Sequence, residues 1–291
     1  MSHKSGFVNI IGSPNVGKST LMNQMMGEKF SITTSKAQTT RHRILGIVND
    51  ENYQIVFSDT PGVLDPHYKL HENMMGYVNT ALKDGDVILL VTDIYETGLK
   101  HAETLNRIKK TSIPVLVLIN KIDQGDQTLI EEKVTYWHNE LPNAEILPIS
   151  ALEGFNLEPI RKRILELIPE SPPYYDKEEI SDRPMRFFVS EMIREKIFMH
   201  YKKEVPYATQ VEVEEYLEDV DIIRIRAVIY VERKTQKGII IGHQGNKIKH
   251  VGIDARKDIE KFVDKKVHLE LYVKVDKDWR GDENKLEKHG Y

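Results

Sequence analysis

The chain has 291 residues, of which 40% are hydrophobic and 30% charged, and its formal net charge is −4. These values exclude a disordered or fibrous protein, and the length exceeds what one domain usually needs, so we expect two globular domains. The chain contains no cysteine, which excludes a disulfide framework and thiolate zinc sites and favours the reducing cytoplasm.

The first half of the chain alternates short β-rich runs with helical patterns as far as residue 168, which is typical of a doubly wound α/β fold. Most of these runs are apolar on both faces, as buried parallel strands are, whereas Tyr53–Phe57 alternates like a strand with one exposed face. We therefore predict an α/β domain over residues 1–170, with a mixed, mainly parallel sheet. The predicted strands are Phe7–Ile11, Tyr53–Phe57, Val87–Val91, Val115–Ile119 and Glu145–Ile149.

The segment Gly12–Ser19 matches the phosphate-binding pattern G-x-x-x-x-G-K-[ST] and lies between the first strand and the helical run Thr20–Met26. In such a loop the backbone N–H groups surround phosphates, Lys18 reaches the β- and γ-phosphates, and Ser19 binds Mg²⁺. An ordinary glycine-rich turn is the alternative, and the strand–turn–helix context argues against it. We therefore expect the α/β domain over residues 1–170 to be a P-loop NTPase domain. The predicted nucleotide-binding residues of this loop are Gly12, Asn15, Val16, Gly17, Lys18, Ser19 and Thr20.

Two further motifs follow predicted strands. In Asp59-Thr60-Pro61-Gly62 the carboxylate of Asp59 can hold Mg²⁺, and the N–H of Gly62 can meet the γ-phosphate. In Asn120-Lys121-Ile122-Asp123 the carboxylate of Asp123 can accept two hydrogen bonds from guanine, while Lys121 lies along the base. Adenine lacks that pair of donors, so this site should reject it.

The segment Ser150-Ala151-Leu152 ends the next strand, where a backbone N–H could meet guanine O6. Each of these three motifs has an ordinary alternative, because loops at strand ends are commonly rich in Asp, Asn and Ser. Together, and all at the carboxyl ends of strands where open α/β sheets bind ligands, they indicate a guanine nucleotide site.

A proline-dense segment, Pro169–Asp176, cannot continue the preceding helix Leu157–Ile168, so we place a linker at residues 171–183. The remainder, residues 184–291, has a different order of elements and predicts a smaller α+β domain with one exposed sheet face and a C-terminal tail. Its predicted elements are helix Met185–Tyr201, strands Ala208–Tyr216 and Ile222–Arg233, helix Asn246–Val263 and strand Val267–Val275.

A G-x-x-G loop, Gly242-His243-Gln244-Gly245, opens the helix Asn246–Val263. This loop and the order of elements resemble a type II KH domain, in which the loop lets an RNA backbone approach and a neighbouring groove receives unpaired bases. Residues 233–266 carry 10 basic and 4 acidic residues, which suits phosphate contact. His243-Gln244 departs from the Lys or Arg often found between the glycines, so Lys247 and Lys249 would compensate.

With the four nucleotide motifs, this second half makes the chain most similar to the bacterial Era family, within the translation-factor-related branch of the Ras-like GTPases. Lys36–His42 resembles the Era switch loop, whose threonine completes the Mg²⁺ shell; we expect Thr40 in that role, with Thr39 as the second choice. Val63 stands where Ras-like enzymes carry a water-orienting glutamine. The resemblance implies that Asn15 helps to bind K⁺, the alternative being a turn-forming role, and that Asn15, Lys18, Thr40 and Gly62 serve hydrolysis.

The resemblance implies a cytoplasmic, monomeric switch that binds GTP and GDP, small-subunit ribosomal RNA and the 30S ribosomal subunit and acts in its assembly. No apolar run is long enough for a transmembrane segment, which leaves peripheral association with the inner membrane face open. Two rival functions remain: a P-loop ATPase motor, and a nucleotide-regulated scaffold whose KH-like domain binds protein. Guanine-versus-adenine affinity and RNA crosslinking discriminate between them.

Overall fold

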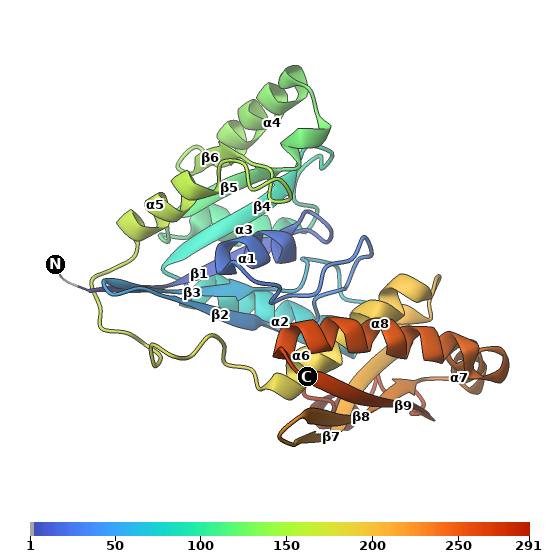
Figure 1. The fold of residues 1–291 in the computed structure, drawn as a ribbon. Coiled ribbons are helices and arrows are strands. Elements are labelled where there is room, and N and C mark those ends of the chain that lie inside the picture. Colours follow the sequence, from blue (N-terminus) through green and yellow to red (C-terminus); the bar gives the residue numbers. More distant parts are fainter. Residues whose placement is uncertain (1–2) are drawn as a thin grey trace. The chain divides into compact units, whose positions relative to one another are not determined.

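The first six strands form one sheet in the order β2-β3-β1-β4-β5-β6 in the computed structural model, which describes residues 3–291 (Figure 1). Strand β2 is antiparallel to β3, and every other neighbouring pair is parallel. The predicted mixed, mainly parallel sheet is therefore confirmed. The strands are β1 Lys4–Gly12, β2 Ile44–Asn49, β3 Tyr53–Asp59, β4 Val87–Asp93, β5 Val115–Asn120 and β6 Glu145–Pro148.

Helices cover this sheet because buried parallel strands are apolar on both faces. Helices α2, α3 and α4 contribute Val78, Ile108 and Trp137 to one core with β1, β4 and β5. Helix α1 contacts β1, β2 and β3, and Arg161 of α5 donates to the carbonyl of Met25 at the end of α1. The helices are α1 Lys18–Met26, α2 Lys69–Asp84, α3 Ala102–Lys110, α4 Gln127–Glu140 and α5 Leu157–Leu167, with a 3-10 turn, η1, at Ile122–Gln124.

The prediction that the strand at Tyr53–Phe57 has one exposed face is wrong. Ile55, Val56 and Phe57 are all fully buried. Strand β2, which the sequence pattern did not indicate, pairs with the open edge of β3 and makes it an interior strand. Helix α1 packs against β3, and the backbone of Tyr174 and Tyr175 lies on Gln54 of the same strand.

The proline-dense segment lies along the first sheet. The backbone N–H groups of Tyr174 and Tyr175 donate to the side-chain oxygen of Gln54 on β3, and the N–H of Ile47 on β2 donates to the carbonyl of Ile180. The first compact unit accordingly ends at Asp182, and the second runs from Arg183 to Tyr291 and takes in Tyr68–Leu70. This segment is packed rather than a flexible spacer.

The second unit holds a three-stranded sheet in the order β7-β8-β9, antiparallel between β7 and β8 and parallel between β8 and β9. Its core joins this sheet to α6 and α8 through Ile193, Ile229 and Val251. Helix α7 was not among the predicted elements. The elements are α6 Met185–His200, η2 Pro206–Ala208, β7 Thr209–Glu218, β8 Ile222–Val231, α7 Lys234–Ile241, η3 His243–Gly245, α8 Asn246–Val263, β9 Lys266–Val275 and α9 Glu283–Lys288.

The outer face of this small sheet is exposed along β9, as the alternation of the strand predicts, and it is covered at one end. The C-terminal segment covers one end of it: Trp279 is fully buried and its indole N–H donates to the carbonyl of Ala208 at 3.0 Å. The ring of His289 lies 4.9 Å from that of Tyr230 on β8. Across residues 3–291, no helix combines the length and the apolar character needed to cross a membrane.

Candidate functional site

The loop between β1 and α1 requires glycine at two positions. A Cβ on Gly12 would lie 2.0 Å from the carbonyl oxygen of Val91, and a Cβ on Gly17 would lie 2.1 Å from the side-chain nitrogen of Asn120. Gly17 also has a φ of 100°, which side chains with a Cβ rarely adopt. The predicted phosphate-binding loop is therefore a tightly packed turn that ends at the first residue of α1.

Lys18 begins α1 and is buried at the base of this loop. Its ammonium group donates to the carbonyls of Gly12 at 3.0 Å and Ser13 at 2.8 Å. Burial lowers the pKa of Lys18 to about 8, against the opposing charges of Asp59 and Glu96. A desolvated cation at this position is suited to binding a polyanion such as a polyphosphate.

Ser19, Thr40 and Asp59 converge beside Lys18. The hydroxyl of Ser19 donates to Oδ2 of Asp59 at 2.7 Å and lies 2.9 Å from the hydroxyl of Thr40, which is 3.5 Å from the same carboxylate oxygen. Thr39 instead lies 2.6 Å from the hydroxyl of Thr34, so Thr40 and not Thr39 joins the cluster.

The cluster fits a magnesium ion. Asp59 is fully buried, and its Oδ1 accepts no hydrogen bond from any residue that the structure describes. Burial raises the pKa of Asp59, although the charge of Lys18 and the hydroxyls of Ser19, Ser31 and Thr40 oppose the rise. Two hydroxyls and an unsatisfied carboxylate oxygen are the hard oxygen donors that Mg²⁺ prefers.

The switch segment forms a wall of the nucleotide pocket. A pocket of about 370 Å³ is lined by the phosphate-binding loop, by Ile32–Lys36 and Gln38–Thr40, and by Gly62, Lys121 and Gln124. Gly62 packs so closely on Pro14 that a Cβ there would lie 2.8 Å from its backbone. Val63 is buried in the core with Met75 and presents no polar group to the pocket.

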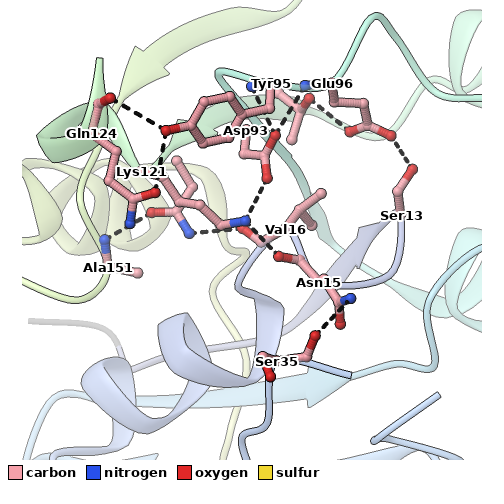
Figure 2. A network of polar contacts seen from close by, with 12 residues as sticks. Ser13, Asn15, Val16, Ser35, Asp93, Tyr95, Glu96, Lys121, Gln124 and Ala151 are labelled. Atoms are coloured by element: carbon pink, nitrogen blue, oxygen red, sulfur yellow. Dashed lines mark hydrogen bonds and ion pairs between the residues drawn. The ribbon is translucent and has the colours of Figure 1, made fainter. Parts of the chain in front are cut away.

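The base-recognition segments are tied to one another and to the phosphate-binding loop. Asn120 donates to the carbonyl of Val16 at 2.8 Å and accepts from the N–H of Ala151 at 2.9 Å, so that N–H is already used within the protein (Figure 2). The hydroxyl of Ser150 donates to a carboxylate oxygen of Asp123 at 2.5 Å. Leu152 is 65% exposed.

The G-x-x-G loop of the second unit has the backbone conformation that its glycines predict. Gly242 and Gly245 have φ values of 71° and 76°, and Gln244 between them has a φ of 50°. The side chains of His243, Gln244, Lys247 and Lys249 are exposed or half-buried at the surface. Next to the loop, α8 and β9 form a groove of about 320 Å³ lined by Ile248, Lys249, Gly252, Ile253, Arg256, Leu269 and Leu271.

Comparison with known proteins covers the whole chain. Residues 7–121 match a family model described as 50S ribosome-binding GTPase, and residues 204–280 match a KH domain model. The chain is 44% identical to GTPase Era of Alkaliphilus metalliredigens over 100% of both chains. It is also 44% identical to the chloroplastic GTPase ERA1 of Zea mays, over 100% of this chain and 71% of that protein. The chain belongs to the Era GTPase family.

Solved structures of Era agree with this assignment. One, a complex with MgGDPNP and nucleotides 1506–1542 of 16S ribosomal RNA, is 39% identical with a TM-score of 0.94 over 99% of both chains. Another, a variant of Aquifex aeolicus Era bound to GDP.AlF4⁻, gives the same identity, TM-score and coverage. The chain is therefore an Era-type GTPase with a C-terminal KH domain.

Sequence reasoning missed residues that support the nucleotide site. Gln124 lines the nucleotide pocket. Glu96 binds Ser13 of the phosphate-binding loop and Asp93 binds Lys121, and neither carboxylate lines the pocket. The position of Asp93 at the carboxyl end of β4 is a signal that could have found it. Nothing in the local sequence distinguishes Glu96.

Proposed function

We propose that this GTPase is a switch that binds the 3′ end of small-subunit ribosomal RNA and acts in assembly of the 30S subunit. The observation that carries the proposal is the presence, in one chain, of a buried Lys18–Asp59 pocket and of a G-x-x-G loop beside an apolar groove. A relative that matches the chain from end to end was crystallised with MgGDPNP and a 16S ribosomal RNA fragment together.

The geometry supports the following nucleotide roles. The loop from Gly12 to Thr20 holds the phosphates, with Lys18 on the β- and γ-phosphates. Asp123 pairs with guanine while Asn120 and Lys121 hold the surrounding loops, and residues 150–152 close the base site. Ser19, Thr40 and Asp59 would hold Mg²⁺, which offsets phosphate charge when it is bound.

Hydrolysis would rely on a cation rather than on a glutamine. Val63 is buried, so it offers no group to orient water. Asn15 is exposed at the pocket, and its side-chain amide donates at 3.3 Å to the carbonyl of Ser35, the residue before the switch loop Lys36–His42. We assign to Asn15 the binding of K⁺ at the phosphates, and to the N–H of Gly62 a contact with the γ-phosphate.

The RNA would lie across α8. Gly242 and Gly245 allow close approach of the RNA backbone, His243 and Gln244 face it, and the groove receives unpaired bases. Lys247 and Lys249 lie at the surface and contribute phosphate contacts.

Binding of a labelled RNA with the sequence of nucleotides 1506–1542 tests this function. The protein loaded with a GTP analogue should bind this RNA more tightly than a scrambled RNA of equal length, and its affinity should fall with added salt. If the protein hydrolyses GTP but binds both RNAs with equal affinity, the proposed ribosomal RNA partner is wrong. Preference for ATP over GTP would favour the motor, and capture of protein without RNA crosslinks would favour the scaffold.

A further inference from the structure

The turn after β4 is a rigid element behind the phosphate-binding loop. Oδ1 of Asp93, the last residue of β4, accepts hydrogen bonds from the backbone N–H groups of Tyr95 and Glu96, each at 3.0 Å. Lys133 of α4 donates to the carbonyl of Glu96 at 2.6 Å. The carboxylate of Asp93 and the backbone of Glu96 are thereby fixed in place (Figure 2).

One carboxylate binds the loop directly. The hydroxyl of Ser13 donates to Oε1 of Glu96, and the hydroxyl of Thr92 donates to its Oε2 at 2.9 Å. Ser13 is the first residue after Gly12, where the loop leaves the sheet. Glu96 belongs to a different segment, 83 residues along the chain from Ser13.

The other carboxylate reaches the loop through a lysine. Oδ2 of Asp93 lies 2.5 Å from the ammonium group of Lys121, which also donates to the carbonyl of Asn15 at 2.7 Å. Asn15 has a φ of 66°, a left-handed conformation that is costly for a residue other than glycine. An ammonium group on its carbonyl therefore supports a backbone conformation that the residue does not favour by itself.

We propose that the turn Asp93–Glu96 positions the phosphate-binding loop for hydrolysis, through Glu96 on Ser13 and through Asp93 and Lys121 on Asn15. The two attachments lie on either side of Pro14 and fix the part of the loop from which Asn15 faces the phosphates. The inference rests on the proposed role of Asn15 in hydrolysis. Glu96 and Asp93 are positioning residues, since neither lines the nucleotide pocket.

The Glu96 arm is tested by a double-mutant cycle on GTP turnover in KCl, with Glu96→Ala, Ser13→Ala and the double variant. Because both single changes remove the Ser13–Glu96 contact, each should lower kcat by about tenfold with GDP affinity within about threefold of wild type, and the double variant should lose no more than Glu96→Ala, which also removes the bond from Thr92. Glu96→Gln retains an oxygen acceptor for Ser13 and should restore most of kcat. Glu103→Ala, which removes an exposed carboxylate of α3, is the matched control.

Additive losses, or wild-type kcat in folded Glu96→Ala, would overturn this arm. If Glu96→Ala does not fold, wild-type kcat in Ser13→Ala overturns it equally. Asp93→Asn keeps the acceptor for Tyr95 and Glu96 but removes the charge facing Lys121, so kcat should fall and GDP should dissociate faster; unchanged kcat would overturn the Lys121 arm. If wild-type rates are equal in KCl and NaCl while the cycle is non-additive, the K⁺ role of Asn15 fails and the positioning role stands.

Discussion

At the scale of single residues, the nucleotide pocket depends on burying opposite charges beside each other. Lys18 and Asp59 are 5% and 0% exposed. Burial lowers the pKa of Lys18 and raises the pKa of Asp59, so it favours the neutral form of each. Their mutual attraction offsets part of that cost, and a bound magnesium nucleotide would offset more. The site is thus stabilised by its ligand more than by the protein alone.

Nucleotide binding should take up a proton near Lys18. Its pKa is about 8 in the folded chain against an ordinary value of 10.5, so between these values the unfolded chain binds a proton that the folded chain lacks. Stability therefore rises with pH across that interval, while phosphate oxygens favour the charged form and restore the proton. Calorimetry of GDP binding at about pH 8.5 in two buffers of different ionisation enthalpy should show uptake of most of one proton. Lys18→Arg, whose guanidinium stays charged, should show none; equal uptake in both proteins would contradict the assignment.

Asp123 should set the choice of base because its carboxylate matches two donors of guanine. Asp123→Asn should weaken GTP binding by at least about tenfold and favour xanthosine triphosphate, whose base offers an acceptor in place of a donor. Competition against a fluorescent guanine nucleotide measures both affinities. Equal affinities of the wild-type protein for ATP and GTP would reject the base-site assignment.

Asn15 should make turnover depend on K⁺, since buried Val63 leaves the attacking water without a side-chain partner. GTP hydrolysis should be slow in NaCl and faster in equimolar KCl, and Asn15→Ala should remove the difference. Rates that agree within about twofold in the two salts, with no effect of Asn15→Ala, would show that the cation role is wrong.

At the scale of elements, the G-x-x-G loop is separable from the core of its unit. Replacing His243 and Gln244 by Asp places two negative charges beside RNA phosphates and should remove most RNA binding. GTP hydrolysis without RNA and the unfolding midpoint should stay near wild type, because Val251 and Ala255 of the packing face are untouched. Wild-type RNA affinity in the folded double variant would make this loop a structural turn only.

Elements whose signals are local were predicted from the sequence, and elements defined by distant contacts were not. Helix α8 has the predicted bounds, Asn246–Val263, because a glycine turn precedes it and its apolar residues recur with helical spacing. Strand β2 is short and contains Gly46, and α7 ends in three isoleucines that favour strands. Tertiary packing decided both.

The nucleotide site divides in the same way. The phosphate-binding loop was predicted because backbone N–H groups at a strand–helix turn bind phosphate wherever they occur. The contacts of Glu96 with Ser13, and of Asp93 with Lys121, join residues 83 and 28 positions apart and leave no local pattern. Which of Thr39 and Thr40 joins the proposed Mg²⁺ site likewise depends on the position of Asp59, which the local sequence does not indicate.

At the scale of the whole molecule, nucleotide state and RNA affinity should be coupled. A coupling of about 1–3 kcal/mol would make RNA affinity differ about 5–150-fold between the GTP-analogue and GDP forms, and bound RNA should change the ratio of GTP affinity to GDP affinity by the same factor. Titration of labelled RNA against both forms measures it. Identical affinities would leave two independent functions on one chain.

The segment before Arg183 has a further consequence for solubility. Strand β2 is the outermost strand of its sheet, and an uncovered outermost strand offers N–H and C=O groups to strands of other molecules. Here the N–H of Ile47 donates to the carbonyl of Ile180. The carbonyl of Leu45 accepts from the hydroxyl of Ser181, and its N–H donates to the carboxylate of Asp182. These bonds occupy backbone groups of β2 with which a strand of another molecule would otherwise pair. A stretch of chain that links two units therefore also protects the sheet against intermolecular β-pairing.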